Sequence, residues 1–317
     1  MRVRRFQLLC LISFSILMGC VSTSKTILDN SSQQYITVLG IAQDAGYPHI
    51  NNPAEFRNLK DNKISRELVV SLGLVDQAEK KKWLFEATPD MPEQLYNLEN
   101  KSFKSKNVID GIFLTHAHIG HYTGLMYFGR EAMGAKEIPV YAMPKMKTFL
   151  EENEPWKQLS TLNNIQIQTI YPNSSLNISP NLMVTPILVP HRDEFSETVA
   201  YKIQGPKKLL LFIPDINKWN LWEKNIQDEL KNVDYALIDA TFFEDGEIPR
   251  PMSEVPHPFI METIELFAEE SVQTRSKIYF IHLNHSNPAL NIKSDKRKYV
   301  EGLGFKFAFE GQIFPLD

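Results

Sequence analysis

The sequence predicts an α+β domain built on two β-sheets, and three observations support this prediction. Short β-rich runs alternate with helical runs from Tyr35 to the C-terminus, no Gly/Ser-rich or Pro-rich linker divides the chain after Gln34, and no repeat of solenoid period is present. The 317 residues are 43% hydrophobic and 23% charged, which is typical of a soluble globular protein and excludes a disordered chain, a collagen and a multi-span membrane protein. One compact domain over residues 35–317 accounts for all three observations.

The predicted strands form two series along the chain. The first series comprises Ile36–Ala42, Glu67–Asp76, Trp83–Ala87, Ile109–Thr115 and Ile138–Ala142. The second series comprises Ile165–Ile170, Leu182–Val189, Thr198–Ile203, Leu209–Ile213, Tyr235–Asp239 and Lys277–His282. Helical periodicity is clearest in a helix predicted over Asn217–Asn232 and in Phe259–Phe267, whose apolar stripes we interpret as core.

The N-terminus precedes the fold. Residues 1–5 carry three arginines, and Phe6–Gly19 is an uncharged apolar run, shorter than the roughly 20 residues of a membrane span. The end of this run, Leu17-Met18-Gly19-Cys20, resembles the lipobox of bacterial lipoproteins, which implies a signal peptide at 1–19, lipidated Cys20 and a polar tether at 20–34. Because Val21 is not acidic, we expect an outer-membrane lipoprotein facing the periplasm, with plain secretion or an uncleaved anchor as the alternatives.

Removal of this signal changes the charge and the thiol content. The mature chain has 317 − 19 = 298 residues and, without Arg2, Arg4 and Arg5, a net charge of 31 − 38 = −7. Cys10 leaves with the signal and Cys20 is capped, so no thiol remains for a disulfide, a metal or a nucleophile. With this charge and no basic stripe beside the histidines, we expect no nucleic-acid partner.

Three histidines occur within six positions, His116, His118 and His121, directly after the apolar strand Ile109–Thr115. They lie at a predicted strand-to-helix turn, before the amphipathic stretch Tyr122–Met133. Neutral imidazole is a common ligand of first-row metals, so the cluster predicts a metal site.

Three further apolar runs end on a potential ligand: His191, Asp215 and His282. Taken singly, each of these residues is weak evidence for a metal site, because Asp215, for example, has the alternative role of capping the helix after it. Together with the first cluster they indicate that one rim of the sheets binds metal.

The order His-x-His-x-x-His, then His, Asp and His resembles the metallo-β-lactamase fold superfamily, and most closely the branch around pyrroloquinoline quinone biosynthesis protein B. The supporting stretches are Val38–Pro48, Thr123–Leu125 and His282–Pro288, and the resemblance extends from Tyr35 to the C-terminus. It implies a four-layer αβ/βα sandwich with a metal cleft at the sheet edges. By the same resemblance His116, His118 and His191 hold a first ion, Asp215 bridges, and His121 with His282 holds a second.

Gly120 departs from the family motif, which has Asp at this position. The second site therefore loses a ligand and a negative charge, and we expect a tight first site and a weak or metal-selective second one. Asp44, in the loop after the first strand, is a candidate replacement, with an ordinary turn residue as the alternative. The quinone-pathway relative departs differently, since it keeps Asp-His and loses the first two histidines of the motif.

His257 and His285 are the candidate catalytic residues. His257 lies in a proline-flanked loop and resembles a catalytic histidine of related phosphodiesterases, with a surface-loop histidine as the alternative. His285 is expected to line the pocket or to orient His282. His49 either faces the cleft or is a turn residue.

These features predict a lipid-anchored hydrolase that uses zinc, as one or two ions, with iron or manganese as alternatives. A metal-bound hydroxide attacks an ester, phosphodiester, lactone or amide of a small molecule, and His257 or His285 protonates the leaving group. The alternatives are an iron-dependent oxidoreductase, as the quinone-pathway relative suggests, and a non-catalytic binding protein of the cell envelope.

Overall fold

The computed structural model describes residues 32–105, 107–249, 251 and 254–317. The predicted signal peptide, Cys20 and most of the tether lie outside the described residues. The first strand begins at Gln34, one residue before the expected domain boundary, and the Gln34 side-chain amide donates a hydrogen bond to Asp76 Oδ1 at 2.9 Å. No helix among the described residues is both long enough and apolar enough to cross a membrane.

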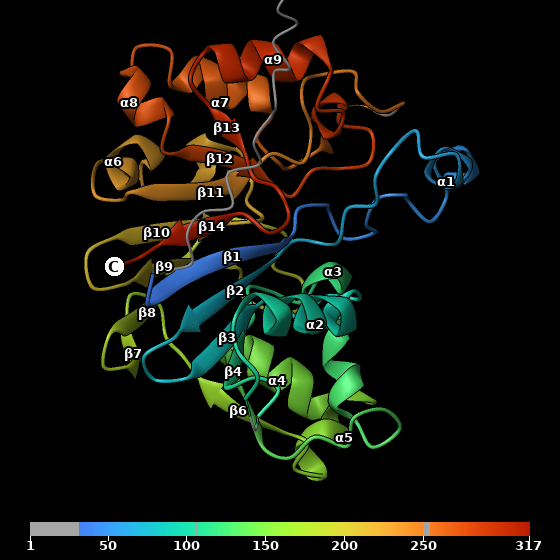
Figure 1. Ribbon diagram of the computed structural model, residues 1–317, viewed down its shortest axis with the longest axis vertical. Coiled ribbons are helices and arrows are strands. Elements are labelled where there is room, and N and C mark those ends of the chain that lie inside the picture. The colour runs from blue at the N-terminus through green and yellow to red at the C-terminus, as the bar shows by residue number, and fades with distance from the viewer. Residues whose placement is uncertain (1–31, 106, 250, 252–253) are drawn as a thin grey trace, which may run out of the picture. The chain divides into compact units, whose positions relative to one another are not determined.

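Within the described part of the chain, fourteen strands form two seven-stranded sheets (Figure 1). The first sheet has the order β14-β1-β2-β3-β4-β5-β6, with bounds β1 Gln34–Gly40, β2 Ser71–Asp76, β3 Lys81–Phe85, β4 Gly111–Phe113, β5 Ile138–Ala142, β6 Ile165–Thr169 and β14 Ile313–Pro315. The second has the order β13-β12-β11-β10-β9-β8-β7, with bounds β7 Leu176–Ser179, β8 Leu182–Leu188, β9 Val199–Gln204, β10 Leu209–Ile213, β11 Tyr235–Asp239, β12 Ile278–Ile281 and β13 Lys306–Phe307. In the first sheet the strand pairs from β14 to β3 are antiparallel and those from β3 to β6 are parallel. In the second sheet the pairs from β13 to β10 are parallel and those from β10 to β7 are antiparallel.

Helices cover the outer face of each sheet, so the chain forms the predicted four-layer αβ/βα sandwich. The first sheet carries α2 (Met91–Lys101), α4 (Pro144–Glu152) and α5 (Trp156–Thr161); the second carries α6 (Ile226–Lys231), α7 (Ile260–Leu266), α8 (Val272–Arg275) and α9 (Asp295–Gly302) (Figure 1). Two short helices, α3 (Ile119–Tyr122) and the 3₁₀ helix η1 (Thr123–Phe128), follow β4. A further 3₁₀ turn, η4, spans Pro288–Leu290.

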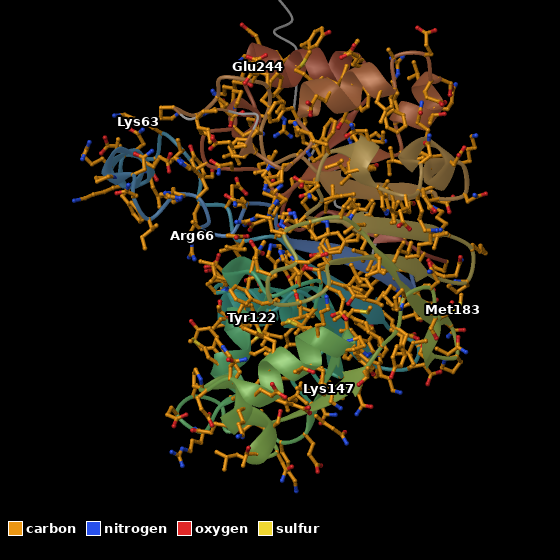
Figure 2. The ribbon with its side chains drawn as sticks, turned by 180° about the vertical axis from the view of Figure 1, so that it is seen from behind. Lys63, Arg66, Tyr122, Lys147, Met183 and Glu244 are labelled. Atoms are coloured by element: carbon orange, nitrogen blue, oxygen red, sulfur yellow. The ribbon has the colours of Figure 1, made fainter. Side chains whose placement is uncertain are left out.

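One segment stands apart from the sandwich. The loop between β1 and β2 carries α1 (Pro53–Lys60), which buries none of its residues and extends away from the sheets (Figure 1). Where the loop returns to the sandwich, the Arg66 guanidinium contacts Asp90 and Glu93 at 2.7 and 2.8 Å. Figure 2 shows Lys63 at the outer part of this loop and Arg66 nearer to the sandwich. We call residues 45–67 the arm.

The core between the sheets is aromatic at its centre. Phe85 of β3 packs edge-on against Tyr201 and Phe212 of the other sheet, with ring centroids 5.2 and 6.3 Å apart. In β10 the residues Leu210–Ile213 are fully buried, as expected for a strand that is covered on both faces. This continuous apolar run is the reason that the sequence identifies β10 correctly.

The predicted helix over Asn217–Asn232 is wrong as a single element. It is divided into the 3₁₀ turn η2 (Trp219–Leu221) and α6, because the Asn225 side chain accepts hydrogen bonds from the backbone N–H groups of Gln227 and Asp228 and so starts a new helix. Asp215 therefore does not cap a helix. Similarly, the stretch Tyr122–Met133 is helical only as far as Phe128.

The strand ends that bear the predicted ligands meet at one edge of the sandwich. The segments after β1 and β12 are joined there by a parallel bridge between Ala42 and Leu283, which connects the two sheets. The backbone N–H of Leu283 donates to Ile41 O at 2.8 Å, and that of Gln43 donates to Leu283 O at 2.9 Å. Residues 240 positions apart in sequence are thus neighbours at the functional edge.

Candidate metal centre

A first group of donor atoms comes from three strand ends. His116 and His118 follow β4, His191 follows β8, and Asp215 follows β10. Asp215 Oδ2 lies 3.3 Å from His116 Nε2 and 3.1 Å from His191 Nε2, while His118 Nδ1 lies 2.8 Å from His116 Nε2. One donor atom from each of the four residues lies within 4.8 Å of all the others. A single ion can therefore contact all four.

The opposite ring nitrogens of two of these histidines are occupied by neighbours. His116 Nδ1 lies 2.8 Å from Thr115 Oγ1, and His191 Nδ1 lies 3.2 Å from Asn217 Oδ1. These contacts orient each ring so that Nε2 faces the shared space, which is the usual arrangement of a metal-binding histidine. Burial, and then the nearby His121, lower the pKa of His116 well below its usual value, so its imidazole is neutral as a ligand requires.

A second group lies beside the first. His121 Nε2 is 3.0 Å from Asp44 Oδ1, His282 Nε2 is 3.5 Å from the same oxygen, and His121 Nε2 is 3.9 Å from Asp215 Oδ2. Asp44 thus occupies the place where a carboxylate was expected to be missing. Its pKa is well below the usual value because the hydrogen bonds and charges of His121 and His282 outweigh the opposing effect of burial.

Buried partners hold the outer side of the second group. His121 Nδ1 lies 3.2 Å from Glu86 Oε1, and His282 Nδ1 lies 2.8 Å from Thr241 Oγ1. Glu86 is fully buried, has the unusual φ of 78°, and accepts a hydrogen bond from Thr115 Oγ1 at 2.6 Å. His282 also has a positive φ, of 64°. Backbone strain of this kind is found where the surrounding structure fixes a functional side chain.

Sequence reasoning did not identify Glu86 or Thr241 as part of the site. The available signal was weak: Glu86 is a charged residue immediately after the apolar strand β3, and Thr241 is two residues beyond Asp239. Glu86 contacts His121, which is 35 positions later in the sequence, and Thr241 contacts His282, which is 41 positions later. Asp239 does support the ligand loops, because it accepts hydrogen bonds from the backbone N–H groups of Ile216 and Thr241.

The donor chemistry fits metal binding. Buried imidazole nitrogens and carboxylate oxygens suit zinc, iron and manganese. Among the described residues, His282 Nε2 is buried and makes no hydrogen bond. A buried ring nitrogen without a hydrogen bond, facing Asp44, is accounted for by an ion at this position.

His257 lies in the centre, and the alternative of a surface-loop histidine is wrong. Only 7% of its surface is exposed. Its Nδ1 lies 2.8 Å from Asp239 Oδ2 and 3.2 Å from Asp215 Oδ1. Burial lowers the pKa of His257, but Asp239 and Asp215 outweigh burial and raise it to about 10.

His285 lies outside the centre. No group of potential metal ligands among the described residues includes it. Its Nδ1 pairs with Glu55 Oε1 of α1 at 2.8 Å, and its ring stacks on that of His49 with centroids 4.2 Å apart. The expectation that His285 orients His282 or lines the pocket is not met by these contacts: His285 and His49 together attach the arm to the sandwich.

A cavity of about 380 Å³ opens beside the two groups. Asp44 and His118 line it on the side of the centre, and the other lining residues are Ala117, Ile119, Tyr122, Phe149, Arg192 and Phe195. We call this cavity the cleft. Three of its eight lining residues are Tyr or Phe, and one, Arg192, is cationic.

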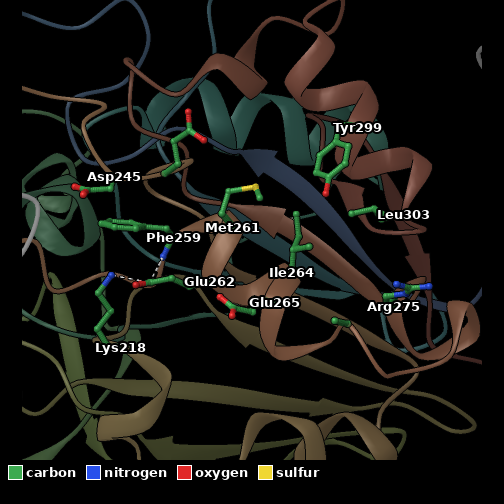
Figure 3. A pocket seen from close by; sticks show the side chains of 12 residues that line it. Lys218, Asp245, Phe259, Met261, Glu262, Ile264, Glu265, Arg275, Tyr299 and Leu303 are labelled. Atoms are coloured by element: carbon green, nitrogen blue, oxygen red, sulfur yellow. Dashed lines mark hydrogen bonds and ion pairs between the residues drawn. The ribbon is translucent and has the colours of Figure 1, made fainter.

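A larger hollow, of about 880 Å³, lies against α7 and α9 (Figure 3). Lys218 lies 3.4 Å above the ring centroid of Phe259 there and contacts Glu262 at 2.6 Å. None of the residues of the two donor groups lines this hollow. The cleft is therefore the cavity that adjoins the candidate chemistry.

Comparison with known proteins agrees with this geometry. A family model described as a beta-lactamase superfamily domain matches residues 81–283. The coenzyme PQQ synthesis protein B of Methylorubrum extorquens (strain PA1) is 23% identical over 308 residues, which cover 89% of this chain and 100% of the relative.

Two solved structures have the same fold. Zinc-bound PqqB from Methylobacterium extorquens has a TM-score of 0.72 and 21% identity, over 88% of this chain and 99% of that chain. A diphosphatase from the PhnP family has a TM-score of 0.59 and 21% identity, over 89% of this chain and 96% of that chain.

Proposed function

The chain belongs to the beta-lactamase superfamily, and from this membership and the geometry of its site we propose that it is a metal-dependent hydrolase of small molecules. The substrate class that we propose is an ester, phosphodiester, lactone or amide. The observation that carries the proposal is the convergence of His116, His118, His191 and Asp215, from three different strand ends, on one space.

The proposed ligands divide into two sets. His116, His118, His191 and Asp215 would hold a first ion, and His121 and His282 would hold a second, with Asp215 facing both. When bound, such ions act as Lewis acids that acidify water and polarise the bond to be cleaved. The zinc in the PqqB structure and the donor set of this chain support zinc as the first candidate, with iron or manganese as alternatives.

The residues around the ligands provide binding and proton transfer. The aromatic walls of the cleft, Tyr122, Phe149 and Phe195, exclude water from an apolar part of the substrate, and Arg192 offers a charge to an anionic part. His257 donates the proton that the leaving group requires, and Asp239 holds the ring in place through Nδ1.

The test combines metal analysis with a hydrolysis screen. We expect purified protein to contain at least one tightly held ion per chain and to cleave one of the chromogenic probes p-nitrophenyl butyrate, bis(p-nitrophenyl) phosphate or nitrocefin. His116→Ala should lose both the ion and the activity. Protein with less than one tightly held ion, unchanged by His116→Ala, would refute the proposal.

An oxidoreductase is the second candidate, and the similarity to the PQQ synthesis protein favours it. Three histidines and a carboxylate suit iron(II) as well as zinc. Consumption of oxygen by iron-loaded protein, without hydrolysis by zinc-loaded protein, would support this candidate over the hydrolase. Ligand binding without turnover in either metal form would instead support a binding protein.

We also propose that the enzyme is anchored to the bacterial outer membrane through Cys20, on the sequence pattern of residues 1–20 alone. The wild-type protein should fractionate with membranes and Cys20→Ser should not. Wild-type protein recovered without lipid in the soluble fraction would contradict the anchor and leave the hydrolase proposal unaffected.

A further inference from the structure

Gly120 is packed so closely that no side chain fits at this position. A Cβ atom built on Gly120 would lie 2.5 Å from Asp44 Oδ1, 2.6 Å from Asp44 Cα and 2.8 Å from Asp44 Cγ. Real Cβ atoms do not approach other atoms this closely, and one of the three contacts is with backbone. The aspartate that the family motif places at this position therefore cannot be accommodated with the loop of Asp44 where it is.

The loop of Asp44 is fixed by the segment that carries His282. The backbone N–H of Gln43 donates to Leu283 O, the backbone N–H of Leu283 donates to Ile41 O, and the side-chain amide of Asn284 donates to Gln43 Oε1 at 2.8 Å. The two segments consequently hold Asp44 and His282 in register. Movement of the loop away from Gly120 would break these hydrogen bonds.

The carboxylate of Asp44 faces the Nε2 atoms of His121 and His282, and not the Nδ1 atoms on the outer side of these rings. Its Oδ1 lies 3.0 Å from His121 Nε2 and 3.5 Å from His282 Nε2. The Nδ1 atoms of both rings already face Glu86 and Thr241. One oxygen and two nitrogens, all within 4.8 Å of one another, therefore point into the same space.

We propose that Asp44 is a ligand of the second metal ion and that Gly120 is required because it leaves room for Asp44. The carboxylate that the family motif supplies from the histidine cluster is supplied in this chain from the loop after β1. This inference rests on the metal centre of the proposed function. With Asp44 as a ligand, the second site regains the negative charge and the ligand that are lost with Gly120. The second site therefore binds metal more tightly than the histidine motif alone suggests.

The arrangement also affects the cleft. Asp44 lines the cleft directly, beside His118. The second ion is thus held on the side from which a substrate enters, by a loop that is continuous with the arm. Substitutions in the histidine cluster and in this loop should therefore act on the same ion.

The experiment counts the metal ions bound by the wild type and by two kinds of variant: one that removes a proposed ligand atom and one that leaves all ligand atoms in place. Wild-type protein dialysed against zinc should hold two ions per chain, and cobalt-loaded protein should show the visible spectra of two sites. Asp44→Asn is nearly isosteric, keeps the fold, and should weaken the second ion by at least the roughly 10-fold to 100-fold that loss of a partner behind a ligand costs, while the first ion remains. Circular dichroism and the melting temperature of the metal-free forms check the fold.

Gly120→Ala is the more diagnostic variant because it removes no ligand atom. The added methyl group displaces Asp44, so the second ion should again be weakened. Gly120→Asp restores the family motif and should weaken it as well. Gly302→Ala is the matched control, because a Cβ there meets nothing within 4 Å, and it should keep two ions.

Each failure has its own pattern. If Asp44→Asn binds both ions as tightly as the wild type, or if Gly120→Asp binds the second ion more tightly, Asp44 is not the ligand. A wild-type protein with one ion, lost in His116→Ala and kept in Asp44→Asn, overturns this inference and leaves the hydrolase proposal intact. A wild-type protein with no ion overturns both.

Discussion

At the residue scale, the centre depends on which nitrogen of each histidine is free. Thr115, Asn217, Glu86 and Thr241 lie beside the outer nitrogens, so four Nε2 atoms face inward. The sequence predicted the histidines because they cluster within six positions or end apolar strands. It did not predict the outer partners, because a buried Thr or Glu has no local pattern that distinguishes it from any other polar residue after a strand.

His257 provides a residue-scale prediction. Its contacts with Asp239 and Asp215 place it among reacting groups, yet the inward donors of both ligand sets remain when it is removed. We expect His257→Asn to keep the metal content and to lower kcat about 10²-fold to 10⁴-fold on the probe that the wild type cleaves. His285→Asn, which removes a histidine attached to Glu55, is the control and should leave kcat unchanged. Equal effects of the two substitutions would contradict the assignment.

Glu67, at the base of the arm, should make stability depend on pH. Burial, and then the carboxylate of Glu310, raise the pKa of Glu67 to about 7, against a partial opposing effect of Arg297. Because folding raises the pKa of Glu67, the protonated side chain favours the folded state. This contribution to stability is fully present below the ordinary glutamate pKa and is lost as the pH rises through about 7.

The unfolding free energy of the wild type should therefore fall between pH 4.5 and 7.5, and that of Glu67→Gln should fall less. The difference should be about 1–2 kcal/mol, because solvent screens the charge of this partly exposed group. Urea unfolding of both proteins across this range measures it. Parallel pH profiles of the wild type and Glu67→Gln would show that Glu67 ionises normally.

At the element scale, close backbone contacts set the position of the histidine cluster. A Cβ on Gly124, in η1, would lie 2.1 Å from Thr88 O. The backbone N–H of Gly124 donates to Ala87 O at 2.8 Å, and that of Ala87 donates to His121 O at 2.9 Å. The end of β3 and the turn after β4 are thus joined without side chains, and a glycine is needed where they touch.

Gly124→Ala should accordingly move His121 as well as destabilise the fold. We expect a loss of about 1–3 kcal/mol of unfolding free energy from overpacking, together with weaker binding of the second ion. Gly302→Ala, in open space on α9, is again the matched control. Retention of wild-type stability and of the second ion by Gly124→Ala would show that this contact can relax.

Element prediction from sequence succeeded where burial makes a strand continuously apolar, and it missed three of the four edge strands, β6 being the exception. The buried neighbouring strands β10 and β11 have the bounds that were predicted. The edge strands β7, β13 and β14 were missed: they have four, two and three residues, and β14 pairs with β1 across almost the whole length of the chain. So short an edge strand is specified by its partner and not by its own sequence.

At the scale of the whole molecule, the two sheets are held together by an apolar core that is separate from the ligands. Phe85 is fully buried and contacts Tyr201 and Phe212 of the opposite sheet. We expect Phe85→Ala to cost about 3–5 kcal/mol in unfolding free energy through the cavity that it leaves between the sheets. Phe56→Ala, on α1, where the side chain is 50% exposed, should change stability by less than about 0.5 kcal/mol. Chemical unfolding that finds equal losses in both variants would contradict this division.

The most direct test of the account is a crystal structure of zinc-loaded protein with anomalous diffraction measured at the zinc edge. We expect two peaks: one about 2.0–2.2 Å from donor atoms of His116, His118, His191 and Asp215, and one at similar distances from His121, His282 and Asp44. Absence of any peak at these residues, or zinc bound only elsewhere on the chain, would contradict the metal centre on which the proposed activity depends.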